Sequence, residues 1–275
     1  MARKVAKSWR GRWQNHDAEG DKIMDMKNIG VYCDPLSKLP LDFKKAQQVN
    51  ELSAYPIING IPDFLDQREV LGLNQKYMRF YDKISFLYRW SARFSKNGIE
   101  ELLGDMAVKN GDRILEVSVG TGDNLRYLHE KAPKADYWGL DISARMLHQC
   151  QKNLKRWGIS AELAHGNAEQ LPYADEQFDV VFHIGGINFF DDKQAAILEL
   201  IRVSKAGTKI IIVDETDKWV KNVYQKTPFV SNYYKGMDDT KLTNAPIEYI
   251  PKDMLDIRLE YKWNGGMYKL SFLKP

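Results

Sequence analysis

Apolar runs, glycine turns and helical periods alternate along the second half of the chain. Residues 113–119 form a nearly continuous apolar run, which is typical of a strand buried on both faces of a parallel sheet. Gly120 and Gly122 follow at once, and Leu125 and Leu128 begin a helical period. The pattern predicts a strand, a glycine turn and a helix. In open α/β sheets, ligands bind at the carboxyl ends of such strands.

The same alternation continues toward the C-terminus. Further strands are predicted at residues 137–141, 161–164, 177–183 and 208–213. Helical periods lie between them, at 144–158 and 195–203. Two last strand-like runs flank Asn264-Gly265-Gly266, which is a hairpin signal. The pattern indicates an α/β fold with a mostly parallel sheet and a C-terminal antiparallel hairpin.

The residues around the glycine turn distinguish between two ligands. A dinucleotide would place its pyrophosphate on the helix N-terminus, usually at a G-x-G-x-x-G turn, which has a third glycine. Leu125 occupies that third position, and Asp123 puts a carboxylate where the phosphates would lie. Glu116 adds a second negative charge at the end of the strand. A cationic nucleoside without phosphates therefore suits this turn better than a dinucleotide.

With Glu116, Gly120 and Gly122, the chain resembles the class I S-adenosylmethionine-dependent methyltransferases, whose first motif reads acid-x-Gly-x-Gly-x-Gly. Ser118 stands where the first glycine usually is, which slightly tightens the approach of the backbone to the ligand. The resemblance implies a doubly wound, seven-stranded Rossmann-like sheet with a C-terminal hairpin. It also implies S-adenosyl-L-methionine as the cofactor, with these four residues at its methionine end.

Asp141 ends the second strand, 19 residues past Gly122, at about the spacing where a carboxylate accepts both ribose hydroxyls. An alternative role for Asp141, shared with Ser143, is a helix N-cap. Ile142 follows as a further candidate for cofactor binding.

Asn167 and Ala168 stand in a segment similar to the family's Gly-Asp-Ala-x-x-Leu-Pro-Phe motif. The resemblance implies that the Asn167 carbonyl oxygen accepts from the adenine amino group and that the Ala168 N–H donates to the base. Asn167 replaces the usual aspartate, and its alternative role is only to shape a turn.

The fourth strand and an aromatic stripe supply candidates for the acceptor pocket. The family's fourth motif faces both the sulfonium and the acceptor, so His183 is a candidate for cofactor contact, and Asn188 and Phe189 for the pocket. His183 is also a candidate general base, with a structural hydrogen-bonding role as the alternative. Tyr77 and Tyr81 belong to an aromatic helical stripe that either caps the substrate or is simply core.

The N-terminal part of the chain has a different composition. Residues 1–28 interleave basic residues with two tryptophans, which favours docking on the protein itself or on a second subunit over a nucleic-acid or membrane arm. Residues 31–65 resemble the zinc-ribbon-like modules of some ribosomal-RNA methyltransferases and of small methyltransferase partner subunits. Cys33 is the only cysteine there, so we expect no metal and a degenerate ribbon held by apolar packing. Within the stripe, Arg79-Phe-Tyr-Asp82 is similar to the start of the ubiquinone/menaquinone C-methyltransferases.

Composition limits the remaining possibilities. Hydrophobic residues make up 44% of the 275 residues, and no run approaches the ~18 apolar residues of a membrane span. The chain lacks a signal-peptide pattern and has two cysteines, so a cytoplasmic location is the expectation. The net charge of +3 weighs against a nucleic-acid partner. A homo-oligomer stays open.

Three units are expected. They are an N-terminal extension with the ribbon-like module at 1–70, a helical substrate cap at 71–110, and the cofactor-binding methyltransferase domain at 111–275. The predicted function is methyl transfer from S-adenosylmethionine to a small aromatic or apolar molecule. The alternatives are an RNA methyltransferase, a nonmethylating protein that retains the fold and, last, a nicotinamide dehydrogenase.

Overall fold

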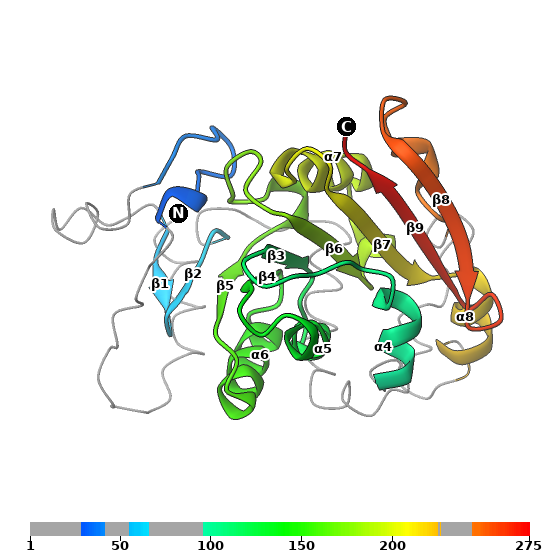
Figure 1. The fold of residues 1–275 in the computed structure, drawn as a ribbon, viewed down its shortest axis with the longest axis horizontal. Helices are drawn as coiled ribbons and strands as arrows, with labels where there is room; N and C mark the ends of the chain where they lie inside the picture. The colour runs from blue at the N-terminus through cyan, green and yellow to red at the C-terminus, as the bar shows by residue number, and fades with distance from the viewer. Residues whose placement is uncertain (1–28, 42–54, 66–95, 225, 227–243) are drawn as a thin grey trace, which may run out of the picture.

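The computed structural model describes residues 29–41, 55–65, 96–224, 226 and 244–275 (Figure 1). The basic N-terminal arm and most of the predicted cap, with Tyr77 and Tyr81, lie outside these residues. Of the cap, the structure describes helix α4, Lys96–Leu103.

Nine strands are present in the described part of the chain. They are β1 (Ile57–Ile58), β2 (Ile61–Pro62), β3 (Arg113–Val117), β4 (Asp136–Asp141), β5 (Ala161–His165), β6 (Val180–Ile184), β7 (Lys209–Glu215), β8 (Leu255–Lys262) and β9 (Met267–Leu273). The longer helices are α5 (Asp123–Lys131), α6 (Ala144–Trp157) and α7 (Lys193–Val203). Short helical segments are η1 (Ile29–Val31), η4 (Ala168–Gln170), η5 (Ile187–Phe189), α8 (Asp217–Trp219), η6 (Val220–Tyr224) and η7 (Ile247–Tyr249).

Seven strands form one sheet in the order β5-β4-β3-β6-β7-β9-β8. The first five strands are parallel, whereas β9 runs antiparallel to both β7 and β8. The strand order reverses between β3 and β6, which places a crevice at the carboxyl ends of these two strands. The predicted doubly wound sheet and its C-terminal hairpin are confirmed.

Two apolar clusters cover the two faces of the sheet. Helices α4, α5 and α6 pack on one face, below the sheet in Figure 1, with the apolar side chains of Leu103, Leu128 and Leu154. Helix α7 packs on the other face through Ile197 and Leu200. Because the parallel strands are buried on both faces, their sequences read as continuous apolar runs rather than as alternating ones.

The described N-terminal residues, 29–41 and 55–65, are called the N-terminal segment below, and they share a hydrophobic core with the sheet. Tyr32 lies 5.4 Å from the Trp138 ring of β4 and 5.6 Å from the Tyr173 ring, measured between centroids. The Phe64 N–H donates to the His165 carbonyl at 2.8 Å, which extends the edge of the sheet beyond β5. The Asn59-Gly60 turn between β1 and β2 has positive φ at both residues, as a two-residue hairpin requires. The expected packing of this segment by apolar residues is therefore present, within a core that it shares with the sheet.

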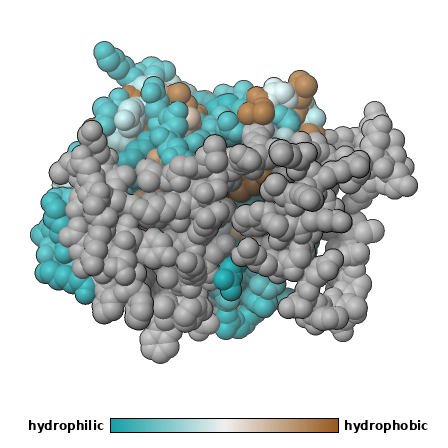
Figure 2. Space-filling view, turned by 180° about the vertical axis from the view of Figure 1, so that it is seen from behind, coloured by the Kyte–Doolittle hydropathy of each residue, from teal (hydrophilic) through white to brown (hydrophobic). Residues whose placement is uncertain are grey.

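Where the described residues are visible in Figure 2, their apolar side chains form small separate spots. The larger exposed apolar side chains include Leu36, Leu39 and Leu255. Among the helices that the structure describes, none combines the length and hydrophobicity needed to cross a bilayer.

Candidate functional site

The two glycines that follow β3 have different structural roles. Both have positive φ, 54° at Gly120 and 84° at Gly122, which only glycine adopts without strain. A Cβ on Gly122 would lie 2.9 Å from the Cys150 sulfur of α6, so this glycine allows α6 to approach the turn closely. A Cβ on Gly120 would meet no described atom within 4 Å. Among the described residues, Gly120 therefore borders space that a ligand could occupy.

Ser118 also has positive φ, 63°, which is unusual for a residue with a side chain. The usual glycine of the motif would adopt this conformation without strain. Across the crevice, Gly186 after β6 has a φ of 121°, and a Cβ there would lie 3.7 Å from the Ser118 hydroxyl oxygen. The ends of β3 and β6 thus face each other through small side chains.

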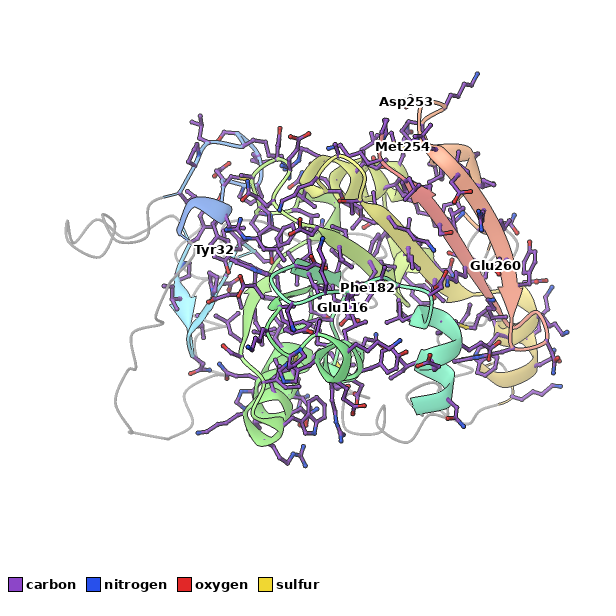
Figure 3. The ribbon with its side chains drawn as sticks, in the orientation of Figure 1. Tyr32, Glu116, Phe182, Asp253, Met254 and Glu260 are labelled. Atoms are coloured by element: carbon purple, nitrogen blue, oxygen red, sulfur yellow. The ribbon has the colours of Figure 1, made fainter. Side chains whose placement is uncertain are left out.

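Glu116 is a fully buried carboxyl group in β3, next to Phe182 of β6 at the centre of the sheet (Figure 3). Its Oε1 accepts a hydrogen bond from the Asn124 side-chain amide at 2.6 Å. Its Oε2 is buried and has no hydrogen-bond partner in the described structure. Burial raises the pKa of Glu116 well above 4.5, and the negative charges of Asp123 and Asp141 add to that effect. A buried oxygen without a partner is costly unless a ligand supplies one.

Asp141 joins the end of β4 to the glycine turn. Its Oδ2 accepts from the Gly120 N–H at 2.8 Å, and its Oδ1 accepts from the Ser143 N–H at 2.8 Å. Ser143 is the N-cap of α6, since its hydroxyl accepts from the Met146 N–H at 3.2 Å. Of the two residues to which the alternative gave the cap, Ser143 is the N-cap itself, and Asp141 supports it by accepting its backbone N–H.

Three carboxyl groups surround the turn, and their charges act on the same buried region. Burial raises the pKa of the Cys150 thiol, and the charges of Glu116, Asp141 and Asp123 raise it further. Cys150 is therefore a packed core residue rather than a thiolate nucleophile. A cationic group with hydrogen-bond donors fits this region, because it would both satisfy Glu116 Oε2 and offset the negative charge. The amino end of S-adenosylmethionine has that chemistry.

Asn167 and Ala168 lie directly after β5, on the same edge of the sheet. The Asn167 Oδ1 accepts from the Glu169 N–H at 3.0 Å, so it caps the short helix η4. The predicted turn-shaping role is present, and the oxygen keeps one lone pair for an exocyclic amine. Ala168 is buried at the first position of η4.

His183 occupies the end of β6, but both of its ring nitrogens are already engaged. Nδ1 lies 3.0 Å from the Val117 carbonyl oxygen, and Nε2 lies 2.9 Å from the Ile187 backbone nitrogen. A neutral ring that donates from Nδ1 and accepts at Nε2 satisfies both contacts. In this arrangement neither nitrogen is available to take a proton from an acceptor, so the geometry favours the structural role over the general base.

Asn188 is fully buried, and the structure surrounds it with hydrogen-bond partners. Its side-chain amide donates to the Glu215 carbonyl at 2.8 Å, and its Oδ1 accepts from the Tyr268 hydroxyl at 3.2 Å. Its backbone N–H donates to Asp214 Oδ2 at 2.9 Å. These contacts bind η5 to β7 and β9, which favours a scaffold role over the predicted pocket role. Phe189, beside it, is 3% exposed.

Asp214 is a residue that sequence reasoning missed. Its Oδ2 accepts from the Gly186 and Asn188 N–H groups, and its Oδ1 accepts from the Glu215 N–H. It therefore holds the loop after β6 in place. The only signal in the sequence is an acid at the end of an apolar strand, the same signal that marks Asp141.

Comparison with known proteins identifies the class. The model of a family described as "Methyltransferase domain" matches residues 114–207. The demethylmenaquinone methyltransferase of Thermotoga maritima is 30% identical over 180 residues, which cover 60% of this chain and 77% of that protein. The ubiquinone/menaquinone biosynthesis C-methyltransferase UbiE of Cupriavidus taiwanensis is 30% identical over 42% of this chain and 49% of its own length.

Among solved structures, the phosphoethanolamine N-methyltransferase 2 of Haemonchus contortus, in complex with S-adenosyl-L-methionine, superposes with a TM-score of 0.57. At 16% identity, over 75% of this chain and 60% of that one, it shows the fold alone. Together with the sequence relatives, the fold and the glycine turn place this chain in the class I S-adenosylmethionine-dependent methyltransferases. S-adenosylmethionine is therefore its cofactor.

Proposed function

We propose that this methyltransferase acts on a small, flat, apolar molecule, with a quinone-type ring as the leading acceptor class. The names of the sequence relatives support this class, since they methylate demethylmenaquinone or act in ubiquinone and menaquinone biosynthesis. The chain spans about half the length of the second relative. The acceptor is therefore a proposal to be tested on this chain itself.

The assignment of the cofactor site rests mainly on Glu116 Oε2, which has no hydrogen-bond partner among the described residues, and on Gly120, near which no described atom would meet an added Cβ. We assign Glu116, with the backbone of residues 118–122, to the methionine end of the cofactor. Asp141 and Ile142 take the ribose side, and Asn167 and Ala168 take the adenine. These residues all lie at the carboxyl ends of β3, β4 and β5, where ligands of open α/β sheets bind.

Catalysis then depends mainly on positioning. The cofactor supplies an activated methyl group on its sulfonium, and transfer is an in-line displacement in which orientation lowers most of the barrier. The small side chains of Ser118 and Gly186 leave room for the reacting groups at the crevice between β3 and β6. We assign no general base to His183, because both of its nitrogens are hydrogen-bonded to the backbone. An electron-rich ring carbon suits a site without an assigned base, because the new C–C bond would form as the S–C bond breaks and the ring proton could then pass to water.

The test is methyl transfer from isotope-labelled S-adenosylmethionine to a reduced, demethylated naphthoquinone with a short apolar tail, followed by mass spectrometry. We expect the label on a ring carbon, and we expect it to disappear in Asp141→Ala. Bulk RNA serves as the competing acceptor, because its methylation would establish the alternative function. Binding of S-adenosylhomocysteine without transfer to either acceptor would contradict the proposed acceptor and would favour a nonmethylating role.

We also propose a reducing, cytoplasmic environment. Cys33 and Cys150 are both buried and free, and burial raises the pKa of each thiol, to about 11 at Cys33. The possible homo-oligomer is to be tested by sedimentation of the full chain.

A further inference from the structure

His165 joins the N-terminal segment to the loop that follows β4. It ends β5 and pairs in register with Asp141, the last residue of β4. Its Nδ1 lies 2.8 Å from Asp63 Oδ1, and its Nε2 lies 3.0 Å from the Ile142 carbonyl oxygen. Asp63 belongs to the segment directly after β2, 102 residues away in the sequence.

The chemistry of these two partners fixes the protonation state of the ring. A carboxylate and a backbone carbonyl are both acceptors, so each contact needs an N–H on the histidine. Neutral imidazole has only one N–H, whereas the imidazolium has two. Only the doubly protonated ring therefore satisfies the arrangement.

The surrounding charges agree with that state. Burial by itself would lower the pKa of His165, but the hydrogen bond and charge of Asp63, the Ile142 carbonyl and the charge of Asp141 outweigh it, so the pKa is raised above 6.5. Asp63, from the segment after β2, and Asp141, from the end of β4, are the charged groups of the described residues that act on the ring. Both favour the imidazolium.

We propose that His165 is a positioning residue for the cofactor. As an imidazolium, His165 links the loop at Asp141–Ser143, which borders the ribose, to Asp63 of the N-terminal segment. The proposal rests on the cofactor site assigned above, in which Asp141 and Ile142 border the ribose. The loop is already held from one side by the Gly166 N–H, which donates to the Asp141 carbonyl at 3.1 Å. His165 holds the next carbonyl, at Ile142.

Loss of the proton must break this link. If Nδ1 is deprotonated, a lone pair faces the Asp63 carboxylate, and if Nε2 is deprotonated, a lone pair faces the Ile142 carbonyl. Either state loosens the loop or its anchor, so the cofactor binds the protonated form more tightly. Linkage is reciprocal, so binding must in turn raise the proton occupancy of His165.

The test is calorimetric titration of the full chain with S-adenosylhomocysteine, between about pH 5 and about pH 8, in two buffers of different ionisation enthalpy. S-adenosylhomocysteine lacks the sulfonium charge, so it does not itself repel the imidazolium. His165→Gln removes the titration, and His148→Gln, on the outer part of α6, is the matched control. Titration of Glu116 would strengthen binding as the pH rises, but it remains in both variants and therefore cancels in the comparison.

We expect His165→Gln to bind about tenfold more weakly than the wild type at the acidic end, with the two converging as the pH rises through the pKa of His165. Near that pKa, binding should take up a fraction of a proton in the wild type and in His148→Gln, but not in His165→Gln. Asp63→Asn keeps an acceptor but removes the charge, so it should move the transition to lower pH. A merely structural histidine would change affinity without this proton uptake.

The outcomes separate the two proposals. Binding whose ratio between wild type and His165→Gln is independent of pH, or proton uptake that persists in His165→Gln, would overturn the positioning role and leave the cofactor site intact. Absence of binding by the folded wild type at every pH would overturn the assigned site, and the positioning role with it. Because the titration of Glu116 contributes to the wild type and to the variant alike, the difference in proton uptake between them is the decisive quantity, and His165→Asn is the second variant should His165→Gln fail to fold.

Discussion

Glu116 and Asp214 are both buried carboxyl groups near the carboxyl ends of strands in the same sheet, yet their surroundings are opposite. Asp214 accepts three backbone N–H groups, from Gly186, Asn188 and Glu215, at 2.9 to 3.0 Å. Glu116 accepts a hydrogen bond from one side-chain amide, and its second oxygen is buried with no partner among the residues that the structure describes. Three donors compensate for the burial of Asp214, whereas the structure leaves part of the burial cost of Glu116 uncompensated.

The difference separates a scaffold carboxylate from a ligand-binding one. A buried polar atom whose bonds are complete has a structural task, whereas one without a partner calls for a ligand, a water or an ion. At Glu116 the neighbouring Gly120 borders open space, and the charges of Asp123 and Asp141 favour a cation. The missing partner at Glu116, together with the space at Gly120 and the neighbouring negative charges, therefore supports the proposed cofactor site.

The largest expected effect is on stability, in Asp214→Ala. Removing the carboxylate leaves three N–H groups without an acceptor in a buried loop, which we expect to lower the free energy of unfolding by about 3 kcal/mol or more. Urea denaturation measures it. Asp253→Ala is the matched control, because Asp253 lies exposed at the surface (Figure 3). Equal urea midpoints for the two variants would show that the three hydrogen bonds to Asp214 do not stabilise the protein, and Asp214 would then not be a scaffold carboxylate.

Glu116→Gln should separate stability from binding. The amide keeps an oxygen for Asn124 and removes a buried charge, so the unliganded protein should lose no stability. Binding of S-adenosylhomocysteine should weaken at least tenfold, or about 1.4 kcal/mol, because the charge that holds the amino group is gone. Calorimetry measures the affinity, with the exposed Glu260 of β8 changed to Gln as the control. Unchanged affinity would mean that Glu116, like Asp214, has a structural role and does not bind the cofactor.

The pH dependence of stability gives the same distinction without a ligand. Burial raises the pKa of Glu116, so the folded state retains this proton to a higher pH than the unfolded state does. Its contribution is complete below about pH 4.5 and is lost as the pH rises through the folded-state pKa. Between wild type and Glu116→Gln, the difference in free energy of unfolding should therefore grow in favour of the variant as the pH rises above 4.5. A constant difference would contradict the raised pKa.

The two glycines of the turn extend the comparison. Gly120→Ala and Gly122→Ala carry a similar strain of about 1 kcal/mol from their positive φ. Only the methyl group added at position 122 would also contact Cys150. Gly122→Ala should therefore lose roughly 1 kcal/mol more stability than Gly120→Ala. Gly120→Ala should instead weaken cofactor binding more, because its methyl group enters the open space. Adding Cys150→Ala should restore part of the stability of Gly122→Ala, and failure to do so would exclude the contact as the cause.

Much of the fold was predictable because it depends on local patterns. The continuous apolar runs specify strands that are buried on both faces, the glycine turn follows from Gly120 and Gly122, and Gly158 ends α6 in the left-handed conformation. The acidic candidates Glu116 and Asp141 could also be found, because their positions relative to the glycines follow a spacing. Their burial and hydrogen bonds then agree with a ligand site.

The roles of the remaining polar residues could not be predicted, because their partners lie far away in the sequence. His183 bonds to Val117, 66 residues away, and Asn188 bonds to Tyr268, 80 residues away. Such partners are set by the order and register of the strands, which no local pattern contains. The link between Asp63 and His165 has the same origin, since it exists only when the N-terminal segment lies along β5.

The smallest expected effect concerns Ser118, whose φ of 63° is strained for a residue with a side chain. Ser118→Gly relieves that strain but also increases the freedom of the unfolded chain, so the net gain should be only about 0.5 kcal/mol. Removing the hydroxyl also opens the space between the ends of β3 and β6, and S-adenosylhomocysteine affinity should stay equal or improve slightly. Thermal unfolding and calorimetry measure the two effects. A loss of affinity with a gain in stability would mean that the Ser118 hydroxyl itself binds the ligand, as is proposed for Glu116.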